Sequence, residues 1–582
     1  MIKNILLLSL LTFGAAATLK AQALVADAKE TVTPKKVDSR KGSITGRVIG
    51  EDGQPSVGQR VNLMPMKRSA PGGNFPALTT DDKGEFKFTN VEVGLYGVIS
   101  SAPGFIAESK DSTGGVKIGD DVTLQLKKGG VIAGRVTNTY GEAMVGVLVL
   151  AAMISDEEGE AVQTGGSRGA MTDDRGAYRL YGLRAGGYIV QVRDSNNFGP
   201  QSDNKELSIY YPSATRDGAQ EVTVQPSAEI SGIDIRYRVQ YGNSVSGNVV
   251  TASTETDARA FTMVELYSAS NGSPINSDNI RPGAGSRGFS IAAVPDGEYE
   301  LIATMQALGN STSRATLRSN PMKVIVKGND ISGLTLKLLP QAGIAGKVTI
   351  EKFVGDKSVC QINRTGWLEE INLNAARQEV AGVALVPLRG AGFRGVAPET
   401  NGEFAFKDLS IGEFRLGWKL PTDFWYAKSL TAPAPKTTKA AAKPIDLAKS
   451  GIHLGSGQYL TNVNLALAEG AASVQGKINA ETGKSLPGKM NVYLIPAAPT
   501  DADNLLRYDS FQSVDGSYNF KNLQPGNYWI VARTKVESDK MKFTDQVFRT
   551  SLRRQAEAAN NKIELKACQH TKDFNLTFTS TR

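Results

Sequence analysis

The sequence predicts an all-β protein, built as a tandem array of about five antiparallel β-sandwich modules with short helical inserts in the fourth and fifth. Three observations predict this architecture. A strand motif centred on glycine recurs five times, a turn-and-strand motif follows each copy in a fixed frame, and each unit closes with a further alternating run. Alternation with a period of two is typical of strands that bury one face, and regular repetition indicates separate modules.

The first motif places a β-branched residue two positions before a glycine and another two positions after it, as in Ile44-Thr45-Gly46-Arg47-Val48. In a strand these three positions share one face. A glycine there indicates that another backbone approaches closely. The five copies centre on Gly46, Gly134, Gly247, Gly346 and Gly476.

The second motif is a turn followed by two strands. In the first module it begins at Gly84, with Phe86 and Phe88 on one strand face and Tyr96 opening the next strand after a second glycine turn. An Asp-x-Gly or Asp-Gly turn closes a hairpin, because glycine tolerates positive φ and Asp caps the turn. The same frame starts at Gly176, Gly402 and Gly516, and in the third module Arg287 takes the place of the glycine.

Closing runs such as Val122-Leu124-Leu126 end each unit and lead directly into the next glycine motif. Two stretches have a helix-like composition, 367–378 in module four and 549–561 in module five. The Pro/Ala/Lys-rich segment 431–444 predicts an extended, mobile loop. The predicted organisation is a signal peptide over 1–23, a flexible lead over 24–41, and modules over 42–128, 129–240, 241–340, 341–469 and 470–582.

The N-terminus predicts export. Lys3 precedes an apolar core over 5–17, and Ala21-Gln22-Ala23 matches a signal-peptidase site. No later segment approaches 18 apolar residues, so we expect no membrane span in the mature chain. The protein would then be periplasmic, surface-associated or extracellular. An uncleaved N-terminal anchor is the alternative.

The repeated motifs resemble the carboxypeptidase regulatory-like domain. The residues that carry the resemblance are the Gly46-Arg47-Val48 opening, the turn Thr80-Asp81-Asp82-Lys83-Gly84-Glu85-Phe86 and the Gly94-Leu95-Tyr96 step, and modules one, two and five match best. The resemblance implies a prealbumin-like or immunoglobulin-like sandwich, also grouped with carbohydrate-binding-like folds. It implies no peptidase activity, because one fold hosts many functions.

Residues for catalysis or metal binding are scarce, so we expect no enzyme, no metal and no cofactor. The two histidines, His453 and His570, lack metal-ligand spacing. The match to G-x-S-x-G at 165–169 lies between a polar loop and a hairpin turn, not in the strand–turn–helix that a nucleophile elbow needs.

Three further features have two interpretations each. Paired acids such as Asp81 and Asp82 could bind calcium, but turn capping explains them better. Lys477 and Asn575 could form an isopeptide bond, although no catalytic acid can be assigned. Cys360 and Cys568 fall in different modules, and we expect two unpaired thiols, with a disulfide between the modules, which export would permit, as the alternative.

The sequence therefore favours an exported, non-catalytic binding or scaffold protein of the cell envelope or exterior, with a polysaccharide or an envelope protein as partner. A passive stalk and a glycoside-active enzyme are the alternatives. The charge of +8 is spread along the chain, which argues against nucleic-acid binding. Exposed aromatic rings stack on sugars, and Trp425 is the first residue to test, with core packing as the alternative role. The full set of candidates is Trp418, Phe424, Trp425, Tyr426, Tyr210 and Tyr211.

Overall fold

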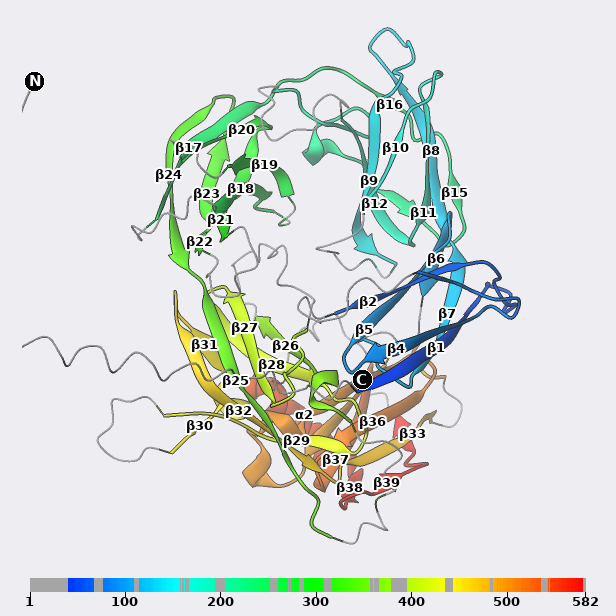
Figure 1. Ribbon diagram of the computed structural model, residues 1–582, viewed down its shortest axis with the longest axis vertical. Coiled ribbons are helices and arrows are strands. Elements are labelled where there is room, and N and C mark those ends of the chain that lie inside the picture. The colour runs from blue at the N-terminus through cyan, green and yellow to red at the C-terminus, as the bar shows by residue number, and fades with distance from the viewer. Residues whose placement is uncertain are drawn as a thin grey trace, which may run out of the picture. The chain divides into compact units, whose positions relative to one another are not determined.

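The computed structural model describes residues 40–66, 77–108, 115–157, 159, 162, 167–193, 205–251, 260–270, 272, 274–281, 287–307, 317–355, 360, 366–377, 395–434, 443–481, 485–488, 490–534, 543 and 545–578 (Figure 1). The predicted signal peptide, the lead up to residue 39 and the centre of the predicted loop, 435–442, lie outside the described residues. The chain forms two units, Met1–Arg40 and Lys41–Arg582, and every strand described below belongs to the second unit.

The predicted all-β architecture is confirmed, with five sandwich modules that each have their own core. In module one, sheet β4-β1-β7-β6 faces sheet β3-β2-β5, and in module two sheet β11-β8-β15 faces β10-β9-β12-β13. The strands of module one are β1 Lys41–Ile49, β2 Arg60–Pro65, β3 Leu78–Thr79, β4 Glu85–Glu92, β5 Tyr96–Ser101, β6 Phe105–Glu108 and β7 Asp121–Lys128. Those of module two are β8 Gly130–Thr137, β9 Leu148–Asp156, β10 Ser167–Met171, β11 Ala177–Leu183, β12 Gly186–Arg193, β13 Ile209–Tyr210, β14 Val222–Val224, β15 Glu229–Ile230 and β16 Ile235–Arg236.

In module three, strand pairing continues from one layer into the other to give one eight-stranded sheet. In module four, sheet β27-β25-β32-β29-β30 faces β26-β28-β31. The strands of module three are β17 Asn243–Thr251, β18 Ala260–Ser268, β19 Pro274–Ile280, β20 Gly288–Val294, β21 Gly297–Ala307, β22 Leu317–Ser319, β23 Met322–Val326 and β24 Ile331–Pro340. Module four comprises β25 Ala342–Glu351, β26 Asn372–Arg377, β27 Glu403–Leu409, β28 Gly412–Lys419, β29 Trp425–Ala432, β30 Ile445–Asp446, α1 Leu447–Ser450, β31 Ile452–Leu454 and β32 Tyr459–Glu469.

In module five, sheet β36-β33-β39 faces β35-β34-β37-β38, and helix α2 packs on the second sheet (Figure 1). The apolar face of α2, formed by Phe548, Leu552 and Ala556, covers Tyr493 and Val531. The elements are β33 Ala472–Ala480, β34 Met490–Pro496, β35 Asp509–Ser513, β36 Ser517–Leu523, β37 Gly526–Thr534, α2 Gln546–Ala559, β38 Lys562–Leu565, β39 His570–Thr571 and β40 Leu576–Phe578.

The strand that carries the glycine motif pairs in the same way in every module. It runs antiparallel to the strand after the hairpin turn and parallel to the closing strand, as β1 does with β4 and β7. A Cβ at the motif glycine would collide with a carbonyl oxygen of that closing segment. This holds for Gly46 and Val122, Gly134 and Ile233, Gly247 and Leu334, Gly346 and Val463, and Gly476 and Phe574. The predicted close approach is therefore to a neighbouring strand within the same module.

The hairpin turn is closed as the sequence predicts. Asp81 accepts hydrogen bonds from the backbone N–H groups of Lys83 and Glu85, at 3.0 and 2.7 Å. The N–H of Val48 donates to the carbonyl of Gly84 at 2.8 Å. The N–H of Val249 donates to the carbonyl of Arg287 at 3.0 Å in the same way, so Arg287 does take the glycine place in module three.

In four modules, the tyrosine at the start of the strand after the second glycine turn stabilises that turn through a hydrogen bond. Its hydroxyl donates to the carbonyl four residues earlier, an arrangement like the tyrosine corner of immunoglobulin domains. The four bonds are Tyr96 to Glu92, Tyr188 to Arg184, Tyr299 to Pro295 and Tyr528 to Gln524. Module four has Phe414 at this position and forms no such bond.

The two expected helical stretches differ in outcome. The one at 549–561 is confirmed as α2, which begins after the N-cap Asp545 and ends at the left-handed Asn560. The one at 367–378 is wrong: Leu368–Glu370 is a single 3-10 turn, and Asn372–Arg377 is strand β26. Ile371 and Leu373 are fully buried while Asn372 between them is not, so a two-residue alternation overrides the helical propensity.

The expectation of two unpaired thiols is also wrong. Cys360 and Cys568 form a disulfide with their Cα atoms 5.2 Å apart. The bond closes a sequence separation of 208 residues and links module four to module five. Closing so long a loop restricts the unfolded chain, which is worth roughly 5 kcal/mol by the chain-entropy model.

We predict that Gly476→Ala destabilises module five. The added methyl group would collide with the carbonyl of Phe574 and lie 3.1 Å from the Tyr518 hydroxyl. We expect a loss of roughly 1–3 kcal/mol, measured as a lower denaturant midpoint for the full chain. Gly488→Ala is the control, because nothing lies within 4 Å of its Cβ position. Equal midpoints for the two variants would contradict the close-approach argument.

Candidate functional site

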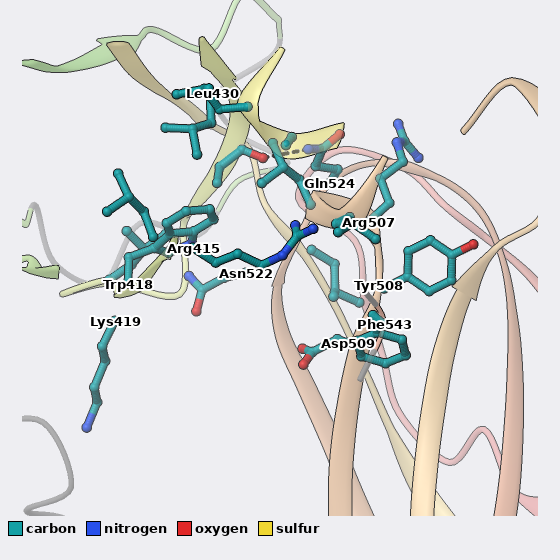
Figure 2. Close-up of a pocket in the computed structure, with 18 of the residues that line it drawn as sticks. Arg415, Trp418, Lys419, Leu430, Arg507, Tyr508, Asp509, Asn522, Gln524 and Phe543 are labelled. Carbon is teal, nitrogen blue, oxygen red and sulfur yellow. Dashed lines mark hydrogen bonds between the residues drawn. The ribbon is translucent and has the colours of Figure 1, made fainter. Parts of the chain in front are cut away.

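A cavity of about 690 Å³ lies where modules four and five meet (Figure 2). Module four contributes β28 and residues around α1, and module five contributes the 3-10 turn Leu505–Arg507, β35 and the end of β36. Ligand pockets in proteins usually fall between about 300 and 1,000 Å³. The cavity therefore has the size of a small-molecule or short-chain site.

Side chains of module five bind the backbone of module four beside the cavity. The Asn522 amide donates to the carbonyls of Thr422 and Trp425, both at 2.7 Å. The Gln524 amide donates to the carbonyl of Ala427 at 2.5 Å. With the disulfide between Cys360 and Cys568, these bonds hold the two walls of the cavity together.

The backbone of Asn522 explains how its amide reaches module four. Asn522 has a φ of 56°, in the left-handed region that Asn tolerates better than most residues. It forms a β-bulge, because the pairing of β33 with β36 shifts register at this point. The bulge turns the residue out of the ladder and aims its side chain at the neighbouring module.

Most cations around the cavity already have partners. Lys521 forms an ion pair with Asp423 at 2.9 Å. Arg507 pairs with Asp501 at 3.3 Å and donates to the carbonyl of Pro525 at 3.1 Å. These contacts fix the walls of the cavity and leave little of either charge for a ligand.

Arg415 differs from them. It makes no hydrogen bond or ion pair with any residue in the described part of the chain. Figure 2 shows its side chain extending past Trp418 toward the middle of the cavity, where Asn522 and Gln524 also lie. Burial lowers the pKa of Arg415, the positive charge of Arg549 lowers it further, and the negative charge of Glu413 opposes the shift. A half-buried guanidinium that forms no ion pair with a described residue is costly, so an anion placed there would be stabilised.

Asp509 lies on the module five wall of the cavity. Burial raises the pKa of Asp509 to about 6, although the N–H of Ser510 donates to the carboxyl group at 2.8 Å and opposes the shift. The carboxyl group is therefore protonated below about pH 6 and can act as a hydrogen-bond donor there.

Aromatic rings supply the apolar part of the lining. Trp418 is partly buried against the module four core, and Phe543 and Tyr508 face the cavity from module five. The hydroxyl of Tyr508 donates to the carbonyl of Ala502 at 2.8 Å, which fixes the ring. Rings next to polar groups suit a ligand with an apolar face and polar edges.

The structure separates the aromatic residues that the sequence grouped together. Only Trp418 lines the cavity. Trp425 is 5% exposed and belongs to the module four core, so its position corrects the choice of Trp425 as the first residue to test. Phe424 packs against the same core, and Tyr426 is half-buried. In module two, Tyr210 lies on β13 and Tyr211 packs against the module core.

Other residues singled out in the sequence have structural contacts. Asp173 accepts from the N–H groups of Arg175 and Ala177, as a turn-capping aspartate does. The Asn575 amide oxygen accepts from the backbone N–H of Lys477 at 2.9 Å. The ring of His570 contacts the hydroxyl of Ser473 at 2.8 Å. No group of three or more metal-ligating side chains occurs in the part of the chain that the structure describes.

The sequence pointed to none of Arg415, Asp509 and Asn522. A sequence signal for Asn522 was present, because the residue six positions after the hairpin-turn position is Asn, Gly or Asp in four of the five modules, and its φ is positive in all five. These residues are Asn90, Gly182, Ala293, Asp408 and Asn522. Arg415 and Asp509 belong to different modules, and no local pattern marks either of them.

Comparison with known proteins gives similarity to solved structures of bacterial proteins at low identity. No protein-family model matches the chain, and no curated protein matches it. The Bacillus anthracis TIE protein is 16% identical with a TM-score of 0.13; the match covers 51% of this chain and half the length of that one. The minor pilin GBS52 of Streptococcus agalactiae is 13% identical over 34% of this chain and 94% of its own, with a TM-score of 0.18. Two B repeat units of the collagen-binding protein of Staphylococcus aureus are 11% identical over 74% of this chain and 100% of theirs, with a TM-score of 0.13.

Scores this low carry no argument about function. The β-sandwich architecture is therefore established by the strand pairing within this chain, and not by these comparisons. Among the described residues, no helix is long and apolar enough to cross a membrane.

We predict that Asp509→Asn stabilises the protein at neutral and alkaline pH. Because the native pKa is raised, the folded state holds the proton more tightly than the unfolded state. The wild type therefore loses stability as the pH rises from about 4 to about 6, and the loss persists above that. We expect the variant to gain up to about 3 kcal/mol at pH 8 and almost nothing at pH 4, measured by denaturant unfolding. Asp515→Asn is the control on the same module, because Asp515 is exposed and hydrogen bonds from Ser517 lower its pKa. A gain that does not depend on pH would contradict the argument.

Proposed function

We propose that this protein is an exported, non-catalytic binding and scaffold protein of the cell envelope or exterior. We further propose that the cavity between modules four and five holds its ligand, and that this ligand is a carbohydrate. The main observation that supports this proposal is that the cavity is preformed. Its two walls are joined by the Cys360–Cys568 disulfide and by the amides of Asn522 and Gln524. A preformed site loses little conformational freedom on binding.

The lining supports carbohydrate as the ligand class. Trp418 offers an aromatic ring, and the polar groups of Arg415, Asp509 and Asn522 surround the same space. Sugars have apolar ring faces and hydroxyl edges, so they match such a mixture. The resemblance of the repeated motifs to the carboxypeptidase regulatory-like domain agrees with this ligand class. We also propose that the modules meet near residues 128, 240, 340 and 469.

The ionisable groups favour binding over hydrolysis. Most glycoside hydrolases use two carboxyl groups, one as acid and one as base or nucleophile. Of the two carboxylates on the described lining, Asp423 is neutralised by Lys521, which leaves Asp509 alone.

We predict that Trp418→Ala weakens glycan binding. The test measures binding of the full chain to an array of neutral and acidic oligosaccharides, followed by titration with the best ligand. Loss of one stacking ring should weaken binding by about 2- to 10-fold. Tyr140→Ala is the control, because Tyr140 is an aromatic residue of module two that is 87% exposed. Equal affinity of both variants for the best ligand would remove the cavity as the site, and a wild-type chain that binds no glycan would favour a passive stalk.

A further inference from the structure

We infer that the cavity between modules four and five recognises the carboxylate group of an acidic saccharide, and that Arg415 is the residue that binds it. The inference rests on the proposed function, since it names the ligand class of the same cavity. Recognition of the carboxylate depends on the charge of Arg415 and not on the presence of a preformed space.

First, Arg415 is a cation of the cavity lining that forms no ion pair or hydrogen bond with any described residue. Arg507 and Lys521 are held by Asp501 and Asp423. Arg549, which is not among the described lining residues, donates to the carbonyl of Phe543 and pairs with Asp503 at 3.1 Å. Arg415 has no such partner among the described residues and is only partly exposed. The charge thus remains for a molecule that enters the cavity.

The second step is the kind of anion. A guanidinium presents a planar fork that pairs with a carboxylate through two parallel hydrogen bonds, each stronger than a neutral one. The carboxyl group of Asp509 belongs to the same lining and would repel an anion when ionised. Because burial raises its pKa to about 6, this repulsion is weakest in mildly acidic conditions. A singly charged carboxylate therefore fits the cavity better than a more highly charged phosphate group.

The third step is the molecule that carries the carboxylate. Figure 2 places the Trp418 indole beside the Arg415 side chain. A ligand whose carboxylate reaches Arg415 therefore has a ring-sized apolar surface available next to it. In a uronic acid the carboxylate is attached to the sugar ring, so one residue of the ligand could meet both groups. An acidic peptide would present its carboxylates on flexible chains with no ring face for Trp418.

The test is calorimetric titration of the full chain with two matched ligands. One is tetragalacturonate and the other is the same tetramer with its carboxylates reduced to alcohols. We expect the wild type to bind the acidic tetramer more tightly, with a preference that falls as salt is raised. Arg415→Gln should weaken binding of the acidic tetramer by about 10- to 100-fold and leave the reduced tetramer unchanged.

Two further variants make the result specific. Arg415→Lys keeps the charge but loses the fork, so it should recover only part of the lost affinity. Arg47→Gln removes an exposed arginine of module one and should bind like the wild type. Thermal melting of each variant checks that the fold is retained.

The outcomes distinguish this inference from the proposed function. If Arg415→Gln weakens both tetramers equally, or neither, the carboxylate assignment is wrong, while a loss of binding in Trp418→Ala would still support the glycan site. If tetraglutamate binds and the saccharides do not, the ligand class is wrong. If the wild type binds neither tetramer nor any glycan of the array, the inference and the proposed function both fail.

Discussion

The contact on which each module depends is the close approach between the backbone of the glycine-motif strand and the closing strand. These two strands pair in parallel although one begins the module and the other ends it. The pairing therefore joins the two ends of a module and closes it. A side chain at the motif glycine would force the carbonyl of the partner away, as it would at Gly346 and Val463. The loss of long-range closure would cost more than one local contact, because the core strands between the two ends would lose their fixed edges.

Closure of each module by its own backbone leaves the turns between strands to contact other modules. The left-handed bulge residue after the hairpin turn illustrates this. In module five it is Asn522, whose amide binds two carbonyls of module four. In module two it is Gly182, whose Cβ position would lie 3.8 Å from Gly104 of module one. The left-handed bulge residue thus lies at the junction of modules one and two and at the junction of modules four and five. Its side chain decides whether it forms hydrogen bonds to the neighbouring module.

The strands and turns could be predicted from the sequence because their causes are local. Alternation, turn residues and the glycine spacing are properties of a few neighbouring positions, and so the frame held even where Arg287 replaces a glycine. The helix predicted at 367–378 does not form, because burial of the alternating Ile371 and Leu373 outweighs the helical propensity of the segment. The Cys360–Cys568 disulfide and the cavity could not be predicted. Both depend on how module four meets module five, and that contact is encoded in residues more than 90 positions apart.

The junction of modules four and five also explains how Arg415 can lie in the cavity without an ion pair to any residue that the structure describes. A buried charge normally destabilises the fold unless another group compensates it. Here the disulfide and the amide-to-carbonyl bonds hold the walls in place without using the charge of Arg415. Two other cations of the lining, Arg507 and Lys521, are compensated by Asp501 and Asp423, so they add little to the local repulsion. The stability of the junction and the chemistry of the cavity are therefore carried by different residues, and an anion that binds Arg415 would add to the stability of the pair.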